Sequence, residues 1–155
     1  MSARLTTLGM SLQYAVETTA GVRPTTGYKK IPEIKGMPSF NPEPSTIEST
    51  TLEETEYKTY EPGLKDLGGA LQYTANLTQE LFGFWNTLIG EFETAEASGL
   101  AVWFSHVHPK LDQAVYYVGV PSPIGANEVA VESMYETTLY ITARNAPEWF
   151  DAPTV

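Results

Sequence analysis

Three glutamates in one short stretch are the first residues whose type and spacing could do chemistry. Glu53, Glu54 and Glu56 lie within residues 50–69, TTLEETEYKTYEPGLKDLGG. General acid–base catalysis needs a carboxyl group whose pKa is shifted by an apolar cleft or by a like charge nearby. This stretch is polar and offers no such cleft. We therefore interpret the three carboxylates as a solvated face or a contact with another subunit, rather than as catalytic groups.

The two histidines are the next candidates. His106 and His108 stand two residues apart in a predicted strand, where they would share a face and could hold a metal ion. A third ligand is missing, because the chain has no cysteine and Asp112 lies beyond the turn that begins at Pro109. We interpret both as strand-end histidines near the surface and expect no metal site and no cofactor.

Motifs that would indicate an enzyme are also missing from the sequence. It has no glycine-rich phosphate loop, no nucleophile elbow and no His-Glu-x-x-His. Gly68 and Gly69 precede a strand rather than a helix, so they lack the context of a phosphate cradle. We expect a protein that is not an enzyme.

The charge balance bears on the kind of partner. The 155 residues include 19 acidic and 9 basic side chains, for a formal net charge of -10. Phosphate binding needs clustered lysine and arginine, so this surface would repel nucleic acid. The charge would suit a wall past which DNA slides without sticking, or it could simply keep the protein soluble. The absence of cysteine fits a reducing compartment, and the N-terminus makes a poor signal peptide.

Residues 50–69 stand out by length as well as by charge. Loops longer than about 12–15 residues inside a compact domain are usually functional or disordered. Disordered segments are poor in aromatic residues, whereas this one holds Tyr57 and Tyr60, so we predict an ordered binding arm with a turn at Pro62-Gly63. The candidate subunit-interface residues of this arm are Thr51, Leu52, Glu53, Glu54, Tyr57, Tyr60, Glu61, Gly63 and Leu64.

One strong helix is predicted over residues 79–97. Apolar side chains recur there at three- and four-residue spacing and make one stripe for packing. The stripe consists of Leu81, Phe82, Trp85, Leu88, Ile89 and Phe92. Asn76 or Thr78 could cap its start, and Gly99 suits a left-handed cap at its end.

Strands account for most of the remaining pattern. They are predicted within residues 29–40, 45–51, 69–78, 100–108, 114–120 and 128–144. The short connections favour antiparallel pairing, so we predict a mainly β fold: a β-sandwich or partly closed barrel with the helix on its flank and a long inter-strand loop at 50–69. Residues 1–155 would form a single domain, with extended arms at 1–28 and 145–155.

Two strand faces are polar but uncharged, and a wall that lines water would suit them. In the strand at 69–78, Leu71, Tyr73 and Ala75 alternate with polar residues that would face outward. A second candidate lies near the end of the last long strand. Together the candidate lumen face comprises Gln72, Thr74, Asn76, Thr138 and Thr142.

The order of these pieces resembles the major tail tube proteins of long-tailed, non-contractile bacteriophages. The likeness covers roughly residues 29–144. It is carried by IPEI at 31–34, ESTTLEE at 48–54, YKTYEPGL at 57–64 and DLG at 66–68, followed by a strand, the helix and late strands that end in YIT at 140–142.

The resemblance implies a structural virion protein made in the host bacterial cytoplasm. It implies hexameric rings that stack into a tail tube with an electronegative lumen, through which DNA passes during ejection without specific binding. The long arm would reach a neighbouring subunit or ring. Tape-measure, baseplate or tail-tip, and terminator proteins would be partners, and related tubes occur in contractile tails and in type VI secretion. No membrane contact is expected.

Other functions stay open at this point. The chain could be a tail terminator or connector, or a secretion-tube homologue. It could also be a β-sandwich that binds carbohydrate or protein through its aromatic side chains. The sequence does not give the host, the strands that face a lumen, the ring-to-ring twist, or whether the arms are ordered before assembly.

Overall fold

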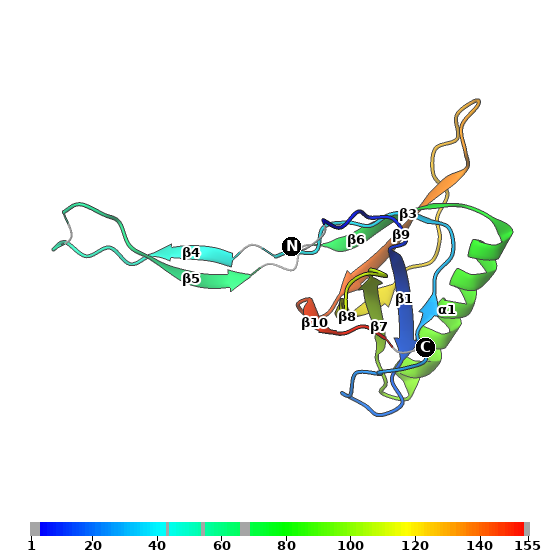
Figure 1. Cartoon of the computed structure of the whole chain (residues 1–155), viewed down its shortest axis with the longest axis horizontal. Coiled ribbons are helices and arrows are strands. Elements are labelled where there is room, and N and C mark those ends of the chain that lie inside the picture. The colour runs from blue at the N-terminus through cyan, green and yellow to red at the C-terminus, as the bar shows by residue number, and fades with distance from the viewer. Residues whose placement is uncertain (1–3, 43, 54, 66–68, 154–155) are drawn as a thin grey trace.

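The computed structural model describes residues 4–42, 44–53, 55–65 and 69–153. Its elements, in chain order, are β1 (Ser11–Val16), β2 (Lys29–Lys30), β3 (Ile34–Gly36), β4 (Pro44–Glu48), β5 (Tyr60–Lys65), β6 (Ala70–Asn76), α1 (Gln79–Ala97), β7 (Val102–Val107), β8 (Gln113–Pro121), β9 (Glu136–Ala143) and β10 (Glu148–Asp151). Figure 1 shows a globular body, made of the sheet and α1, from which the β4–β5 ribbon projects.

One curled antiparallel sheet forms a half-barrel. Its strands run in the order β2-β1-β7-β8-β9-β6-β3, and β10 pairs with β8 outside this path. The long strand β8 holds the sheet together: β7 lies along one edge, and the other edge is shared between β10 at residues 113–116 and β9 at residues 119–121. The fold class expected from the sequence is confirmed: mainly β, antiparallel, with one helix.

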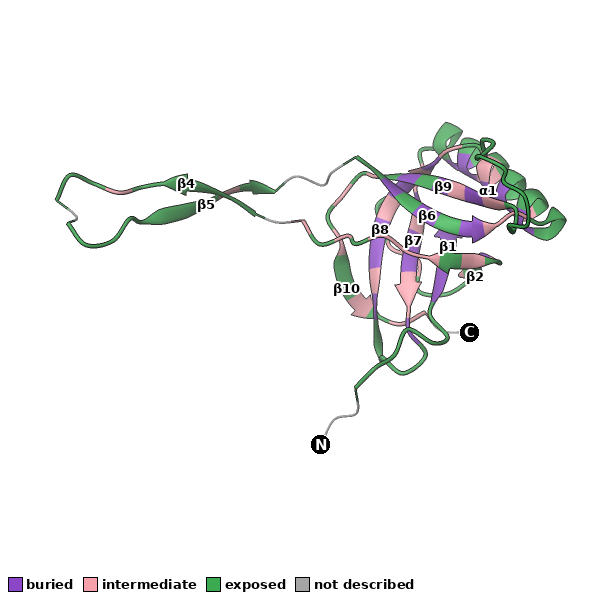
Figure 2. Ribbon diagram, turned by 90° about the horizontal axis from the view of Figure 1, so that it is seen from above, coloured by how far each residue is buried: buried purple, intermediate pink, exposed green. Residues whose placement is uncertain are grey.

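The core lies between α1 and one face of this sheet (Figure 2). Strand side chains alternate in direction, so one set of alternate residues on the central strands points into this core. The fully buried large side chains include Tyr14 on β1, Tyr73 on β6, Trp85 on α1, Phe104 on β7 and Tyr117 on β8. Trp85 also donates its indole N–H to the carbonyl of Ser122 at 2.8 Å, which satisfies its one polar atom.

Helix α1 begins and ends with side-chain and backbone caps that the sequence signals. Of the two candidate N-caps, Thr78 is the one used: its hydroxyl accepts from the amide of Leu81 at 3.2 Å. Gly99, at φ +75°, forms the left-handed C-terminal cap, and the amide of Leu100 donates to the carbonyl of Ala95 at 2.8 Å.

The buried face of α1 includes fewer of the predicted apolar residues than their spacing in the sequence suggested. Leu81, Trp85, Leu88 and Phe92 are buried, and Ile89 is partly buried. Phe82 is 45% exposed, contrary to its placement in the stripe. The buried positions of the helix also include Ala95, so the buried face runs along residues 81, 85, 88, 92 and 95 and turns Phe82 outward.

The terminal segments differ from the extended arms expected for residues 1–28 and 145–155. Residues 11–16 form β1, which lies between β2 and β7 and buries Leu12 and Tyr14 in the core. Residues 148–151 form β10 on the edge of β8. Arg23 packs on this region, with its guanidinium 4.6 Å from the Tyr116 ring centroid and 4.5 Å from that of Phe150. Both segments are therefore integral parts of the body.

Two further differences concern the connections. The segment 128–144, predicted as one long or two short strands, holds one strand, because β9 begins only at Glu136 and an exposed loop precedes it. Pro62 and Gly63 do not form a turn but lie inside β5, where Pro62 pairs with Thr46.

Within the described parts of the chain, no helix is long and apolar enough to cross a membrane.

Candidate assembly surfaces

The most prominent candidate surface is the hairpin arm, residues 44–65, which consists of β4, β5 and their connection. It extends far from the body in both views (Figures 1 and 2). Hydrogen bonds at the end of the ladder hold the two legs together: the amide of Ser49 donates to the carbonyl of Thr59 at 2.8 Å, and the amide of Thr59 donates to the hydroxyl of Thr50 at 2.9 Å. The predicted arm is thus a two-stranded ribbon that starts earlier than the segment 50–69.

Glycine permits the two legs to approach closely near the body. A Cβ atom placed on Gly63 would lie 2.4 Å from the hydroxyl of Ser45 and 3.3 Å from its carbonyl oxygen. The same hydroxyl donates to the carbonyl of Leu64 at 2.7 Å. A side chain at position 63 would therefore separate β4 from β5.

Large apolar side chains on the arm are mostly exposed to solvent. Leu52 and Leu64 are exposed at 104% and 90%. The full set comprises Ile47, Leu52, Tyr57, Tyr60 and Leu64. A two-stranded hairpin without a packed face is at most marginally stable alone. This combination of length, exposure and apolar character is that of a surface made for a partner.

The candidate interface residues fall into two groups along the arm. Thr51, Leu52, Glu53 and Tyr57 lie in the exposed connection between the strands. The other group belongs to β5 and comprises Tyr60, Glu61, Gly63 and Leu64. Glu54 lies outside the described residues. The described glutamates of the cluster, Glu53 and Glu56, are exposed, and Glu56 lines only an open hollow with Thr55, Tyr57 and Thr59.

The structure brings the two halves of the candidate lumen face together. In the β6–β9 ladder, Gln72 pairs with Tyr140, Thr74 with Thr138, and Ala70 with Thr142. Directly paired residues share a face of the sheet, so two separate sequence patterns form one surface, which is uncharged from the Ala70–Thr142 pair to the Thr74–Thr138 pair. Asn76 is half-buried at the end of this surface, opposite Glu136, which forms an ion pair with Lys35.

A buried polar chain crosses the core between β6, β7 and β8. The hydroxyl of Tyr73 lies 2.5 Å from the Tyr117 hydroxyl and 2.5 Å from Nε2 of His106. Burial raises the pKa of both tyrosines and lowers the pKa of His106 to about 4. The three groups are therefore neutral near pH 7, and Tyr117 can donate to Tyr73, which donates to His106. The chain satisfies core polar groups and joins three strands.

Because His106 belongs to this buried hydrogen-bonded chain, we expect the stability of the folded protein to depend on pH. His106 takes up a proton near pH 4 when folded but near pH 6.5 when unfolded, so its contribution is complete above about pH 6.5 and is lost as the pH falls toward 4. We expect a loss of at most about 3 kcal/mol over this range. Urea denaturation at pH 7, 5.5 and 4 measures it. The free energy of unfolding of the variant His106→Gln should change less between pH 7 and pH 4. An equal change in both proteins would contradict the role assigned to His106.

The second histidine and one glutamate serve other local contacts. His108 is buried, with its Nε2 close to the carbonyl of Thr6 and its Nδ1 accepting from the amide of Lys110 at 3.0 Å. Glu17, 4% exposed, accepts from the amide of Ala101 at 2.8 Å and the indole N–H of Trp103 at 2.7 Å. Sequence reasoning missed Glu17, because nothing local marks it as buried. In the described ranges, no three His, Asp or Glu side chains gather as a metal site would require.

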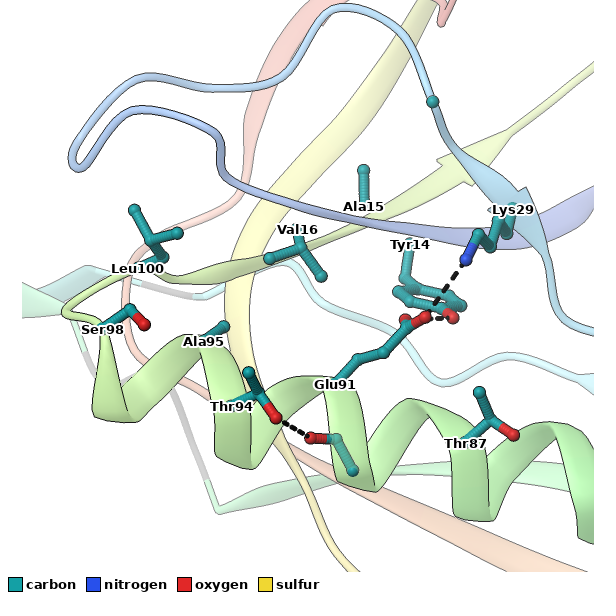
Figure 3. Close-up of a pocket in the computed structure, with 12 residues that line it drawn as sticks. Tyr14, Ala15, Val16, Lys29, Thr87, Glu91, Thr94, Ala95, Ser98 and Leu100 are labelled. Carbon is teal, nitrogen blue, oxygen red and sulfur yellow. Dashed lines mark hydrogen bonds and ion pairs between the residues drawn. The ribbon is translucent and has the colours of Figure 1, made fainter.

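A groove of about 750 Å³ lies between β1 and α1 (Figure 3). Its walls include Val16, Gly90, Thr94 and Ala95. Glu91 lines the groove beside β1: it accepts from the Tyr14 hydroxyl at 2.6 Å and forms an ion pair with Lys29 at 3.1 Å. Burial, and then the hydrogen bond and charge of Glu91, raise the pKa of Tyr14. Sequence reasoning did not find this groove, because it depends on how far the helix stands from the sheet.

The loop before β9, residues 122–135, also projects from the body (Figure 1). Strand structure was predicted for part of it. It makes one side-chain hydrogen bond within itself and one to β9: the hydroxyl of Ser133 donates to the carbonyl of Ala130 at 2.9 Å, and Asn127 donates to the Thr138 hydroxyl at 3.2 Å. Its exposed apolar side chains are Val129, Val131, Met134 and Tyr135.

Comparison with known proteins identifies the fold through structure rather than sequence. No protein-family model matches the chain, and no curated protein matches it in sequence. A chain in the cryo-EM structure of the anti-feeding prophage baseplate, sixfold symmetrised, superposes with a TM-score of 0.59 at 9% identity, covering 97% of this chain and 98% of that chain.

A chain in the cryo-EM structure of the anti-feeding prophage cap, which terminates the tube, superposes with a TM-score of 0.56 at 9% identity, covering 98% of this chain and 95% of that chain. Both likenesses include nearly the full length, so the whole architecture is shared rather than one motif. At this level of identity they establish the fold alone.

Proposed function

We propose that this protein is a structural component of a phage-type tail. Its copies would associate into hexameric rings that stack into the tail tube of a non-contractile phage, the conduit for DNA ejection. The observation that carries the proposal is the hairpin arm, residues 44–65, whose large apolar side chains are exposed in the single chain. Burial of such side chains is the main favourable term in protein association.

Two other features support the tube. The β6–β9 surface around Thr74 and Thr138 is polar without charge, and the chain as a whole carries a net charge of -10. Such a wall would hydrate well and would not hold phosphates. The fold is shared with chains of the anti-feeding prophage baseplate and tube-terminating cap, which are parts of an assembled particle.

The role we propose is structural rather than catalytic. The exposed glutamates of the arm lack an enclosing cleft, and the buried tyrosine–histidine chain is fully occupied by its own hydrogen bonds. Partners would be other copies of the chain, the tape-measure protein, and the baseplate or tail-tip and terminator proteins. The place of action would be the virion.

A second candidate is a tail component that forms one ring without stacking, such as a terminator or connector, or a secretion-tube subunit. The similarity to a chain in a structure of a tube-terminating cap favours it. A protein at the end of a tube needs lateral contacts but only one axial neighbour, and the fold alone is compatible with both arrangements.

Electron microscopy of the purified protein over a concentration series tests these proposals. Tubes of stacked rings at high concentration are the expected result, because head-to-tail contacts that close make rings and further contacts stack them. Single rings that never stack would favour the terminator candidate. Monodisperse monomers at every concentration, also after addition of preformed tail tips, would contradict self-assembly.

A further inference from the structure

We propose that the hairpin arm of one copy docks into the groove between β1 and α1 of the next copy. Leu52 and Tyr57, in the connection between β4 and β5, would enter the groove. This inference rests on the proposed self-assembly and names the two surfaces that meet.

The positions of the two surfaces fit a head-to-tail contact. The arm leaves one side of the body, and α1 lies on the side opposite to it in both views (Figures 1 and 2). Two different surfaces on opposite sides make a heterologous contact, which repeats from copy to copy. Each leg of the arm, 11 of its 22 residues, spans about 35 Å at the rise of a β-strand. The arm therefore projects well beyond the body that carries it (Figure 1), where it can contact a neighbour.

The groove has the size and lining for apolar side chains. Its volume of about 750 Å³ is within the range of pockets that enclose a drug-sized ligand. Its walls present Ala15, Val16, Ala95 and Leu100 together with the open space at Gly90, where an added Cβ atom would meet nothing within 4 Å. The arm supplies the matching exposed leucine and tyrosine side chains.

Charge does not select this site, so the contact would rest on apolar side chains. The arm carries five glutamates and two lysines in a chain whose net charge is -10. At the groove, Lys29 is already paired with Glu91 at 3.1 Å. Lys30 pairs with Gln13 in the β1–β2 ladder, on the face of the sheet opposite to Lys29 and Tyr14. The glutamates of the arm would therefore stay at the solvent-exposed rim of the contact.

A groove-filling variant tests the docking site with a closely matched control. Gly90 and Gly83 both lie on α1, and an added Cβ atom has open space at either position. Only Gly90 lines the groove. Methionine is a better helix former than glycine, so both Gly90→Met and Gly83→Met should raise the melting temperature of the monomer. Only Gly90→Met should raise the critical concentration for assembly, by at least tenfold in sedimentation and electron microscopy.

Cross-linking tests the same contact directly, because the chain has no cysteine of its own. Leu52→Cys mixed with Thr94→Cys should form a disulfide between copies on assembly. Leu52→Cys mixed with Asn86→Cys, which is exposed on the same helix but outside the groove, should not.

The outcomes separate this inference from the proposed function. Tubes or rings that form equally well with Gly90→Met and Gly83→Met, or cross-link only to position 86, would overturn the groove as the docking site while leaving self-assembly intact. A cross-link from Val131→Cys to Thr94→Cys, with none from Leu52→Cys, would assign the groove to loop 122–135 instead. Failure of the unmodified chain to assemble at all would overturn the proposed function itself.

Discussion

Gly119→Ala is expected to lower the free energy of unfolding by about 2–3 kcal/mol, from a single added methyl group. A Cβ atom at this position would lie 2.6 Å from Cγ2 of Ile141 and 3.1 Å from Cδ2 of Phe104. Both neighbours are fully buried, and Phe104 also stacks on Tyr117 at 5.7 Å between ring centroids, so neither has room to move aside. Close-packed cores transmit such strain to their neighbours rather than absorbing it.

Gly36→Ala provides the control for this prediction. Gly36 also lies in a strand of the sheet, but a Cβ atom there would meet only the Cβ of Thr74 at 3.9 Å, an ordinary contact. Its alanine variant should unfold at nearly the same urea concentration as the unmodified protein. If both variants lost a similar free energy of unfolding, the loss at position 119 would reflect the replacement of any strand glycine. It would then not be due to the contact with Ile141 and Phe104.

The second prediction concerns the arm. The triple variant Leu52→Ser, Tyr57→Ser and Leu64→Ser should raise the critical concentration for assembly at least about 100-fold. Burial of one large apolar side chain contributes about 1.5–3 kcal/mol, so loss of three removes several powers of ten in affinity. The same variant should unfold within about 0.5 kcal/mol of the unmodified monomer, because exposed side chains away from the core have little effect on stability.

Sedimentation velocity over a concentration series measures the assembly, and urea denaturation of the monomer measures the stability. The matched control Leu8→Ser with Val22→Ser removes exposed apolar side chains from outside the arm, where they are exposed at 84% and 57%. It should assemble normally. Normal assembly of the triple variant would show that the arm is not an interface.

The helix and the strand beside it were predictable because each carries a complete local signal. Residues 79–97 combine an apolar stripe with a threonine before it and a glycine after it, and the observed helix has the same bounds. The alternation at 69–78 gave both β6 and its buried face, with Leu71, Tyr73 and Ala75 inside. Such patterns depend on neighbours in the sequence, so no knowledge of the tertiary structure is needed.

Other elements depend on distant partners and left weaker signals. Strand β1 is only six residues long and is buried because β7, nearly 90 residues later, pairs with it. Strand β5 carries Pro62 and Gly63, which indicate a turn in most contexts, and it is tolerated because a ribbon has free edges on both sides. The Tyr117–Tyr73–His106 chain likewise needs the sheet to curl, because β6 pairs with neither β7 nor β8 and its Tyr73 meets the other two residues only across the core.

The candidate surfaces were only partly visible in the sequence for the same reason. The aromatic and acidic composition of residues 50–69 marked them as unusual, but their projection from the body follows from the sheet. Gln72 and Thr138 were separate suggestions until the β6–β9 register placed them on one surface. The groove beside Gly90 had no signal at all, since it is a space between elements rather than a pattern within one.

The arm is inserted between two strands that are themselves neighbours. β3 precedes it, β6 follows it, and these two strands pair directly in the sheet. The chain thus leaves the body and returns to it at the same edge, whatever the intervening length. Insertions, deletions and changes of composition in the arm can accumulate without shifting the register of the sheet. The choice of assembly partner can therefore diverge among descendants of this fold while the body that carries it stays the same.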